Sequence, residues 1–241
     1  MSTAATGTRP PRWLGWTAIV PVAFLLVFLA YPLGRLVSTV LDVDGPAGFA
    51  RQLQSPALWR LGALAAGQAL VSTALALAVG LPIANVVSRY RFRGRALVQA
   101  LVTVPFVLPT VVVALALRSL LGGAVPQGLL LVVLAHAYVN LAVVVRIVGA
   151  QWAQHDGSLE IVARTLGASR ARAFVDVTWP ALRPAIGSTA AVVFVFCFTS
   201  LGIVLVLGDP STRTLESQIL RQTSVLLDFP GAAATALVQL L

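Results

Sequence analysis

The chain has 241 residues, of which 58% are hydrophobic and only 10% charged, and its mean hydropathy is +0.91. Soluble domains average about a quarter charged residues, so this composition excludes a soluble globular protein and predicts an integral membrane protein. All 17 basic residues are Arg, which excludes a phosphate-binding P-loop because that motif requires a Lys.

Side chains that bind metals or carry catalysis are scarce. The single Cys, Cys197, lies in an apolar run and excludes a disulfide framework, so we interpret it as a small core residue. His136 and His155 lack the spacing of metal ligands. The net charge of +9 does not indicate nucleic acid, because the Arg residues gather at the ends of apolar segments. We therefore predict no catalytic residue, no metal, no bound cofactor and no nucleic-acid partner.

The first long apolar segment covers residues 13–33 and has no charge between Arg12 and Arg35. A hydrocarbon core of about 30 Å requires roughly 20 apolar residues in a helix. Residues 31–34, Tyr-Pro-Leu-Gly, make a poor cleavage site. We therefore predict an uncleaved spanning helix rather than a signal peptide.

Five further apolar segments follow, at residues 61–87, 96–117, 129–145, 185–207 and 229–241. Pro105 and Pro109 lie inside the second of these, and we interpret them as packing kinks of a spanning helix. The last segment reaches Leu241 after about 13 residues, fewer than a span requires, so we expect the native reading frame to continue. The sequence predicts an all-α integral membrane protein with about six transmembrane helices, the last one truncated.

The Arg residues are divided unequally between the two sets of loops. With the N-terminus inside, most of them fall on the inner side, including those at 89–95 and 146–183. This excess predicts a multi-pass protein of the inner (plasma) membrane with a cytoplasmic N-terminus and residues 36–60 outside. We interpret Arg89 and its basic neighbours up to Arg95 as an orientation signal in contact with lipid headgroups.

A short charged stretch, LEIVARTLGASRARAF at residues 159–174, separates two of these apolar segments. One apolar face of a helix is predicted there, because four apolar residues recur at i, i+3, i+4 and i+7. These residues are Leu159, Val162, Ala163 and Leu166. Glu160 and Arg164 are placed for an i,i+4 ion pair.

The ends of this helix also have sequence signals. Asp156 is a candidate N-cap, and Gly167 is suited to end the helix with a positive φ. A second short helix is predicted from Ser169 to about Val177, closed by Pro180 and Pro184 before the next span. The residues alone leave open whether the first helix lies on lipid headgroups or on a partner protein.

The run E-I-V-A-R-T-L-G-A-S-R, followed by F-V-D-V-T-W-P-A-L-R-P-A, resembles the EAA loop of binding-protein-dependent ABC importer permeases. That loop carries E-A-A, three residues and a Gly, with a downstream Pro, and its short helix docks in a groove of the ATPase subunit. Glu160, Ala163, Gly167 and Pro180 match this pattern, whereas Val162 stands where the family usually has Ala.

Three other stretches resemble the permeases for iron(III) and thiamine: VPFVLPTVVVAL, LAHAYVNLAVVVR and FTSLGIVLVLGDPSTRTLESQI. Those permeases carry two halves of about six spans in tandem, and this chain resembles the first half. The resemblance implies a MetI-like type I fold, with residues 1–56 forming an N-terminal spanning helix and external loop and residues 57–241 the transmembrane domain.

The same resemblance implies a permease subunit that is not itself an enzyme. Its implied partners are ABC ATPase subunits that use ATP, a solute-binding protein, a second permease half, and the lipid bilayer. The implied solute is iron(III) or thiamine, with polyamine or sulfate as alternatives. The implied ATPase-coupling residues are Leu159, Glu160, Ala163, Arg164, Leu166, Gly167 and Pro180.

Four polar residues inside the spans are candidates to line the pathway: Gln68, Asn85, His136 and Asn140. Polar groups at membrane depth face the bundle interior or a watery cavity, although interhelical hydrogen bonds without a transport role are the more common explanation of their presence. An ion-coupled secondary transporter is the rival class, but it requires intramembrane ionisable residues, and the predicted spans contain no Asp or Glu.

Overall fold

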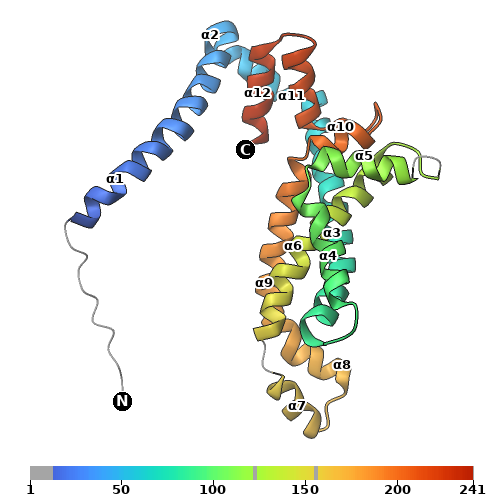
Figure 1. Ribbon diagram of the computed structural model, residues 1–241. Coiled ribbons are helices and arrows are strands. Elements are labelled where there is room, and N and C mark those ends of the chain that lie inside the picture. Colours follow the sequence, from blue (N-terminus) through green and yellow to red (C-terminus); the bar gives the residue numbers. More distant parts are fainter. Residues whose placement is uncertain (1–12, 122–123, 155–156, 241) are drawn as a thin grey trace. The chain divides into compact units, whose positions relative to one another are not determined.

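The computed structural model describes residues 13–121, 124–154 and 157–240, and all regular structure among these residues is helical. The chain divides into two compact units. One contains residues 56–218, and the other joins the N-terminal 55 residues to residues 219–241. Figure 1 shows the helices of both units.

The unit that contains the N-terminal segment begins with one long helical run. The segments α1 (Trp13–Leu25), η1 (Leu26–Ala30) and α2 (Tyr31–Leu53) follow one another, with a kink at Gly45, whose φ is +62°. Residues 17–42 of this run are long and apolar enough to cross a membrane. The short helix α12 (Phe229–Gln239) packs against α2 through Val40, Ala233 and Ala234.

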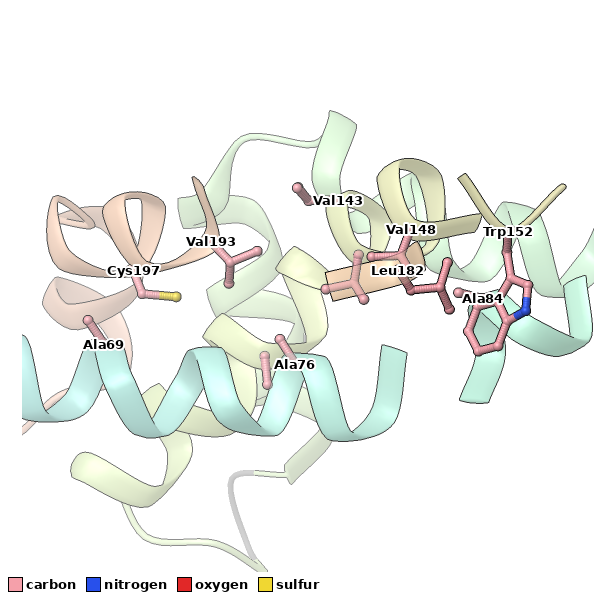
Figure 2. Packing of buried hydrophobic residues seen from close by; sticks show 11 residues of the cluster. Ala69, Ala76, Ala84, Val143, Val148, Trp152, Leu182, Val193 and Cys197 are labelled. Carbon is pink, nitrogen blue, oxygen red and sulfur yellow. The ribbon is translucent and has the colours of Figure 1, made fainter. Parts of the chain in front are cut away.

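Three long helices form the core of the second unit: α3 (Pro56–Arg89), α6 (Leu129–Gln154) and α9 (Trp179–Phe198). Each packs against the other two, and Figure 1 shows them side by side. Figure 2 shows that α3 contributes small residues to this contact, where Ala69, Ala76 and Ala84 face larger side chains of α6 and α9. Small residues bring backbones close together, which is how helices associate in a membrane without a hydrophobic driving force.

The segment predicted as one span at residues 96–117 is instead two helices, α4 (Arg95–Val107) and α5 (Thr110–Leu121), bent by 117°. Pro105 lies inside α4 without breaking it. The break comes at Leu108, whose ψ of 148° is extended, because the ring of Pro109 disfavours the helical conformation in the residue before it. The prediction of a simple kink was therefore wrong.

The predicted span at residues 185–207 is also divided. The helix α9 ends at Phe198, and a separate short helix, α10 (Gly202–Leu207), packs against α5. A Cβ atom at Gly202 would lie 2.6 Å from Oγ1 of Thr110, so this close approach requires glycine. The remaining helix, α11 (Leu215–Ser224), begins in this unit and ends in the other.

Four helical runs of the described residues are long and apolar enough to span a membrane, and the bent pair α4–α5 makes a fifth if counted as one span. The all-helical membrane fold is therefore as the composition predicts. The spanning run that includes α9 begins at Arg170 rather than at the predicted residue 185. Hence the end of the charged stretch, from Arg170 onward, and the membrane helix after it form one continuous helical run.

Candidate functional site

The charged stretch forms a short helix, α7 (Ser158–Thr165), at one end of the bundle (Figure 1). Its predicted apolar face is largely uncovered, with Leu159 61% exposed and Leu166 83% exposed. Val162 is also exposed, whereas Ala163 is half-buried. An eight-residue helix is marginal by itself, so contacts at its ends and its inner side must hold it. The predicted N-cap, Asp156, lies outside the described residues.

The end of α7 is a tight turn that depends on glycine. Gly167 has a φ of +94°, as its position after the helix predicts. The N–H of Gly167 donates to the carbonyl of Arg164, and the N–H of Ala168 donates to the carbonyl of Ala163. This pair of hydrogen bonds is the Schellman arrangement, which satisfies carbonyls that the helix end leaves free. The chain therefore reverses direction here in a defined conformation.

The chain then enters a single rod that leads into the membrane. Ser169 caps the helix α8 (Arg170–Ala173) by accepting a hydrogen bond from the N–H of Arg172. A π-helical turn, η2 (Phe174–Thr178), joins α8 to α9, so residues 170–198 form one continuous run of 29 residues. With a rise of 1.5 Å per residue this rod is about 43 Å long.

The two prolines after the charged stretch were predicted to end the second helix, but they do not. Pro180 and Pro184 both lie inside α9. The wider turn of η2 precedes them, and the N–H of Trp179 donates to the carbonyl of Phe174, five residues earlier. A π-type turn accommodates the missing donor and the bulky ring of a proline that would otherwise break the helix.

Glu160 holds α7 against the bundle. Its Oε2 lies 3.2 Å from Nη2 of Arg89 at the end of α3, and it accepts a hydrogen bond of 3.4 Å from the hydroxyl of Thr178. Thr178 is fully buried. The predicted pair with Arg164 does not form among the described residues, because Glu160 points inward while Arg164 is exposed.

The position of Glu160 also changes how the loop pattern is read. Counted back from Gly167 across three residues, the E-A-A positions are residues 161–163, so the acid of the pattern falls on Ile161. Glu160 is one residue earlier and faces the bundle, whereas Ile161 is 62% exposed. Glu160 is thus an internal anchor of α7 through its contacts with Arg89 and Thr178.

Sequence reasoning missed two further contacts that position this stretch. Arg89 was interpreted as a topology signal, and its place within a run of Arg residues conceals its specific partner. Trp152, near the end of α6, is 7% exposed and its ring centroid lies 6.4 Å from that of Phe174 in η2. Figure 2 shows Trp152 beside Ala84 and Leu182, so three helices enclose it.

Three of the four predicted pathway residues meet in the centre of the bundle. Nε2 of Gln68 donates to the carbonyl of Cys197 at 2.8 Å, and Oε1 of Gln68 lies 3.0 Å from Nδ1 of His136. Nδ2 of Asn140 donates to the carbonyl of His136 at 2.9 Å and lies 3.5 Å from Sγ of Cys197. Interhelical hydrogen bonds therefore do connect these side chains. Cys197 is fully buried, which confirms its prediction as a core residue.

Two of these residues also line a cavity of about 410 Å³, together with side chains of α4, α5, α9 and α10. The cavity residues are Phe106, Thr110, His136, Val139, Asn140, Phe196, Thr199, Ser200, Leu201, Gly202 and Ile203. Asn85 does not join them, since it lies 17 residues from Gln68 along α3, about 26 Å at helical rise. The structure thus separates Asn85 from the other three candidates.

A second cavity, of about 420 Å³, lies at the end of the bundle opposite α7. Gln68 lines it, so the network of Gln68 and His136 stands between the two cavities. Two guanidinium groups, those of Arg60 and Arg213, also line it and have no carboxylate partner among the described residues. Nearby, hydrogen bonds from Ser211 and Thr212 lower the pKa of Asp209 below its usual value.

Comparisons with known proteins identify the family of this chain. The sequence profile of the family described as "Binding-protein-dependent transport system inner membrane component" matches residues 76–241. A probable molybdenum ABC transporter permease of Haloferax volcanii is 33% identical over 223 residues, which are 89% of this chain and 81% of that protein. The thiamine transport system permease ThiP of Brucella abortus is 31% identical over 242 residues, which cover 91% of this chain and 44% of ThiP.

A third relative, the molybdate/tungstate permease WtpB of Thermococcus kodakarensis, is 33% identical over 140 residues, 58% of this chain and 57% of WtpB. Among solved structures, a bacterial ABC transporter that imports the acidic polysaccharide alginate has a TM-score of 0.69 at 18% identity, covering 95% of this chain and 91% of that chain. This last likeness shows a shared fold. The chain spans less than half the length of ThiP.

Proposed function

Since this chain belongs to the family of binding-protein-dependent transport system inner membrane components, we propose that α7 is the element through which it responds to an ATPase. The chain is a permease subunit of an ABC importer and is not itself catalytic. Such permeases bind no cofactor, and the ATP is used by the partner ATPase.

The observation that carries the proposal is the exposed apolar face of α7 on a rigid base. Leu159, Val162 and Leu166 are all more than half exposed, at an end of the bundle that the Arg distribution assigns to the cytoplasm. Burying one Leu side chain stabilises a complex by about 1.5–3 kcal/mol. A groove on the ATPase that covers these three residues would therefore supply substantial binding free energy.

The internal contacts of α7 support transmission of movement rather than binding alone. Glu160 ties the helix to α3 and to Thr178, while Gly167 joins it to the rod of residues 170–198. A displacement of α7 would therefore move α9 and the end of α3 together. Ala163, Arg164 and Pro180 complete the proposed coupling segment, Pro180 by its place at the start of α9.

For the translocation path we propose the face that carries His136 and Asn140, with Gln68 behind them, opposed by a second permease half. Asn85 is kept as a separate candidate nearer the cytoplasmic end. We also propose residues 1–56 as a spanning helix and external loop, and residues 57–241 as the transmembrane domain in the inner (plasma) membrane. The family match at residues 76–241 lies inside this second region.

The solute that we propose is thiamine, delivered by a binding protein, as the name of ThiP suggests for a relative 31% identical. A molybdate-type oxyanion is the second candidate, since two relatives carry that name and Arg60 and Arg213 line the cavity opposite α7. Guanidinium groups recognise oxyanions through paired charged hydrogen bonds. Iron(III), expected from the sequence, is not among the relatives described above.

The coupling proposal is tested by measuring the affinity of the full chain, in lipid nanodiscs, for a partner ABC ATPase. Leu166→Ser is expected to weaken this affinity at least about tenfold, since it removes one buried apolar contact. Leu205→Ser is the control, because Leu205 is also an exposed Leu but lies on α10, away from α7. An unchanged ATPase affinity in Leu166→Ser would show that α7 lies on lipid instead.

A further inference from the structure

A third cavity, at the end of the bundle near α7, is lined by basic and polar side chains. It lies between α3, α4 and α6 and has a volume of about 340 Å³, within the range of about 300–1,000 Å³ that is typical of small-ligand sites. Its polar lining residues are Ser88, Arg95, Gln99, Thr103 and Arg146. Two guanidinium groups therefore share one cavity, and the fold must leave them a source of negative charge.

The chain itself does not supply that charge. Neither Arg95 nor Arg146 forms an ion pair with a described residue, and residues 45–155 contain no Asp or Glu. The two described carboxylates near this end of the bundle are already paired, Glu160 with Arg89 and Asp176 with Arg172. A second copy of the chain offers no carboxylate from residues 45–155 either. An anion in this cavity therefore comes from another kind of molecule.

Both guanidinium groups are accessible to such an anion. Arg146 is exposed and Arg95 is half-buried, and both line the cavity. The helix α3 ends at Arg89 and α4 begins at Arg95, so the cavity lies where the chain turns back at the surface of the bilayer. Arg146 comes eight residues before the end of α6, and a side chain of its length reaches the lipid headgroups from that depth.

The helix α4 has one polar face and one apolar face beside this cavity. Arg95, Gln99 and Thr103 recur every four residues and all line the cavity, which places them on one face of the helix. An apolar stripe on another face of α4 is more than half exposed, and it consists of Leu97, Leu101 and Val104. Exposed apolar residues in a spanning segment suit the acyl chains of lipids. A lipid molecule therefore finds both of its parts matched on α4.

We propose that this cavity binds the phosphate group of an anionic lipid. The guanidinium groups of Arg95 and Arg146 donate paired, charged hydrogen bonds to the phosphate oxygens, and the side-chain amide of Gln99 donates a further one. The acyl chains of the lipid lie along the apolar stripe of α4. A free phosphate ion offers the same oxygens but no acyl chains, so the stripe favours the lipid. Basic pockets between spanning helices are suited to anionic headgroups of the cytoplasmic leaflet, and this site depends neither on the solute nor on the ATPase.

The test measures binding of phosphatidylglycerol to the full chain in detergent micelles, by titration and native mass spectrometry. The double variant Arg95→Gln, Arg146→Gln is expected to bind at least about tenfold more weakly, because it loses two charged hydrogen bonds. The double variant Arg91→Gln, Arg93→Gln is the matched control, since it removes the same charge from exposed residues that do not line the cavity. Its affinity should change little, because exposed charges are screened by salt.

A conservative variant and two competitors complete the test. Arg95→Lys, Arg146→Lys keeps both charges but not the paired donors, so an intermediate affinity is expected, which a loss of the fold would not produce. Neither inorganic phosphate nor phosphatidylcholine should displace phosphatidylglycerol at equal concentration. Displacement by inorganic phosphate would assign the cavity to a soluble anion, and equal losses in the two Gln variants would show diffuse attraction to the surface. Either result would overturn the lipid site and leave the permease proposal unaffected.

Discussion

Replacing Gly167 with Val is expected to uncouple the permease from its ATPase while leaving its insertion in the membrane intact. Gly167 has a φ of +94°, and a Cβ atom at this position would meet nothing within 4 Å. Steric contact is therefore not the cause of the expected effect. The cost comes from the backbone, because the left-handed region disfavours residues with a Cβ and most of all β-branched residues.

The magnitude follows from that backbone cost. A left-handed conformation costs an L-residue about 1–2 kcal/mol relative to glycine, which lowers the population of the native turn by a factor of about 5–30. The two hydrogen bonds of the turn, from Gly167 and Ala168, weaken with it. Since α7 docks through an orientation that this turn defines, the affinity for the ATPase should fall by a similar factor.

The assay is titration of the ATPase against the full chain in nanodiscs, with the membrane abundance of each variant measured in parallel. Gly167→Asn should retain most of the affinity, because Asn tolerates the left-handed region. Gly187→Val provides a second control, since Gly187 in α9 also has open space around it but has no positive φ. Native affinity in Gly167→Val would refute the role assigned to the turn.

Two further predictions concern packing and orientation. Gly80→Ala should lower the free energy of unfolding by about 1–3 kcal/mol, because the added Cβ would lie 2.7 Å from a methyl group of Val144. Thermal unfolding checks this, and an unchanged melting temperature would show that α3 and α6 can separate at this point without cost. A membrane-impermeant maleimide added outside the cell should modify Ser211→Cys, at the end of the bundle opposite α7, and spare Ser169→Cys, next to α7. The reverse labelling pattern would place α7 outside and exclude ATPase docking.

Much of the architecture is determined by local sequence patterns. The apolar segments are recognisable because a span must satisfy its own backbone hydrogen bonds and present apolar side chains to lipid over about 20 residues. The conformation of Gly167 is also a local property, since the end of a helix favours a residue without a Cβ. Both features follow from a few neighbouring residues. The structure has the turn at Gly167 and forms helices from the apolar segments, although it divides the segments at residues 96–117 and 185–207.

Tertiary contacts decided what local patterns leave open. The sequence offers Glu160 the nearby Arg164 as a partner, but packing of α7 on the bundle places Glu160 beside Arg89, 71 residues earlier. Likewise, the spacing of His136 and Asn140 predicts a shared face, while the partner Gln68 comes from α3, 68 residues before His136. Contacts over such separations depend on how helices pack together, and periodicity within one helix carries no information about them.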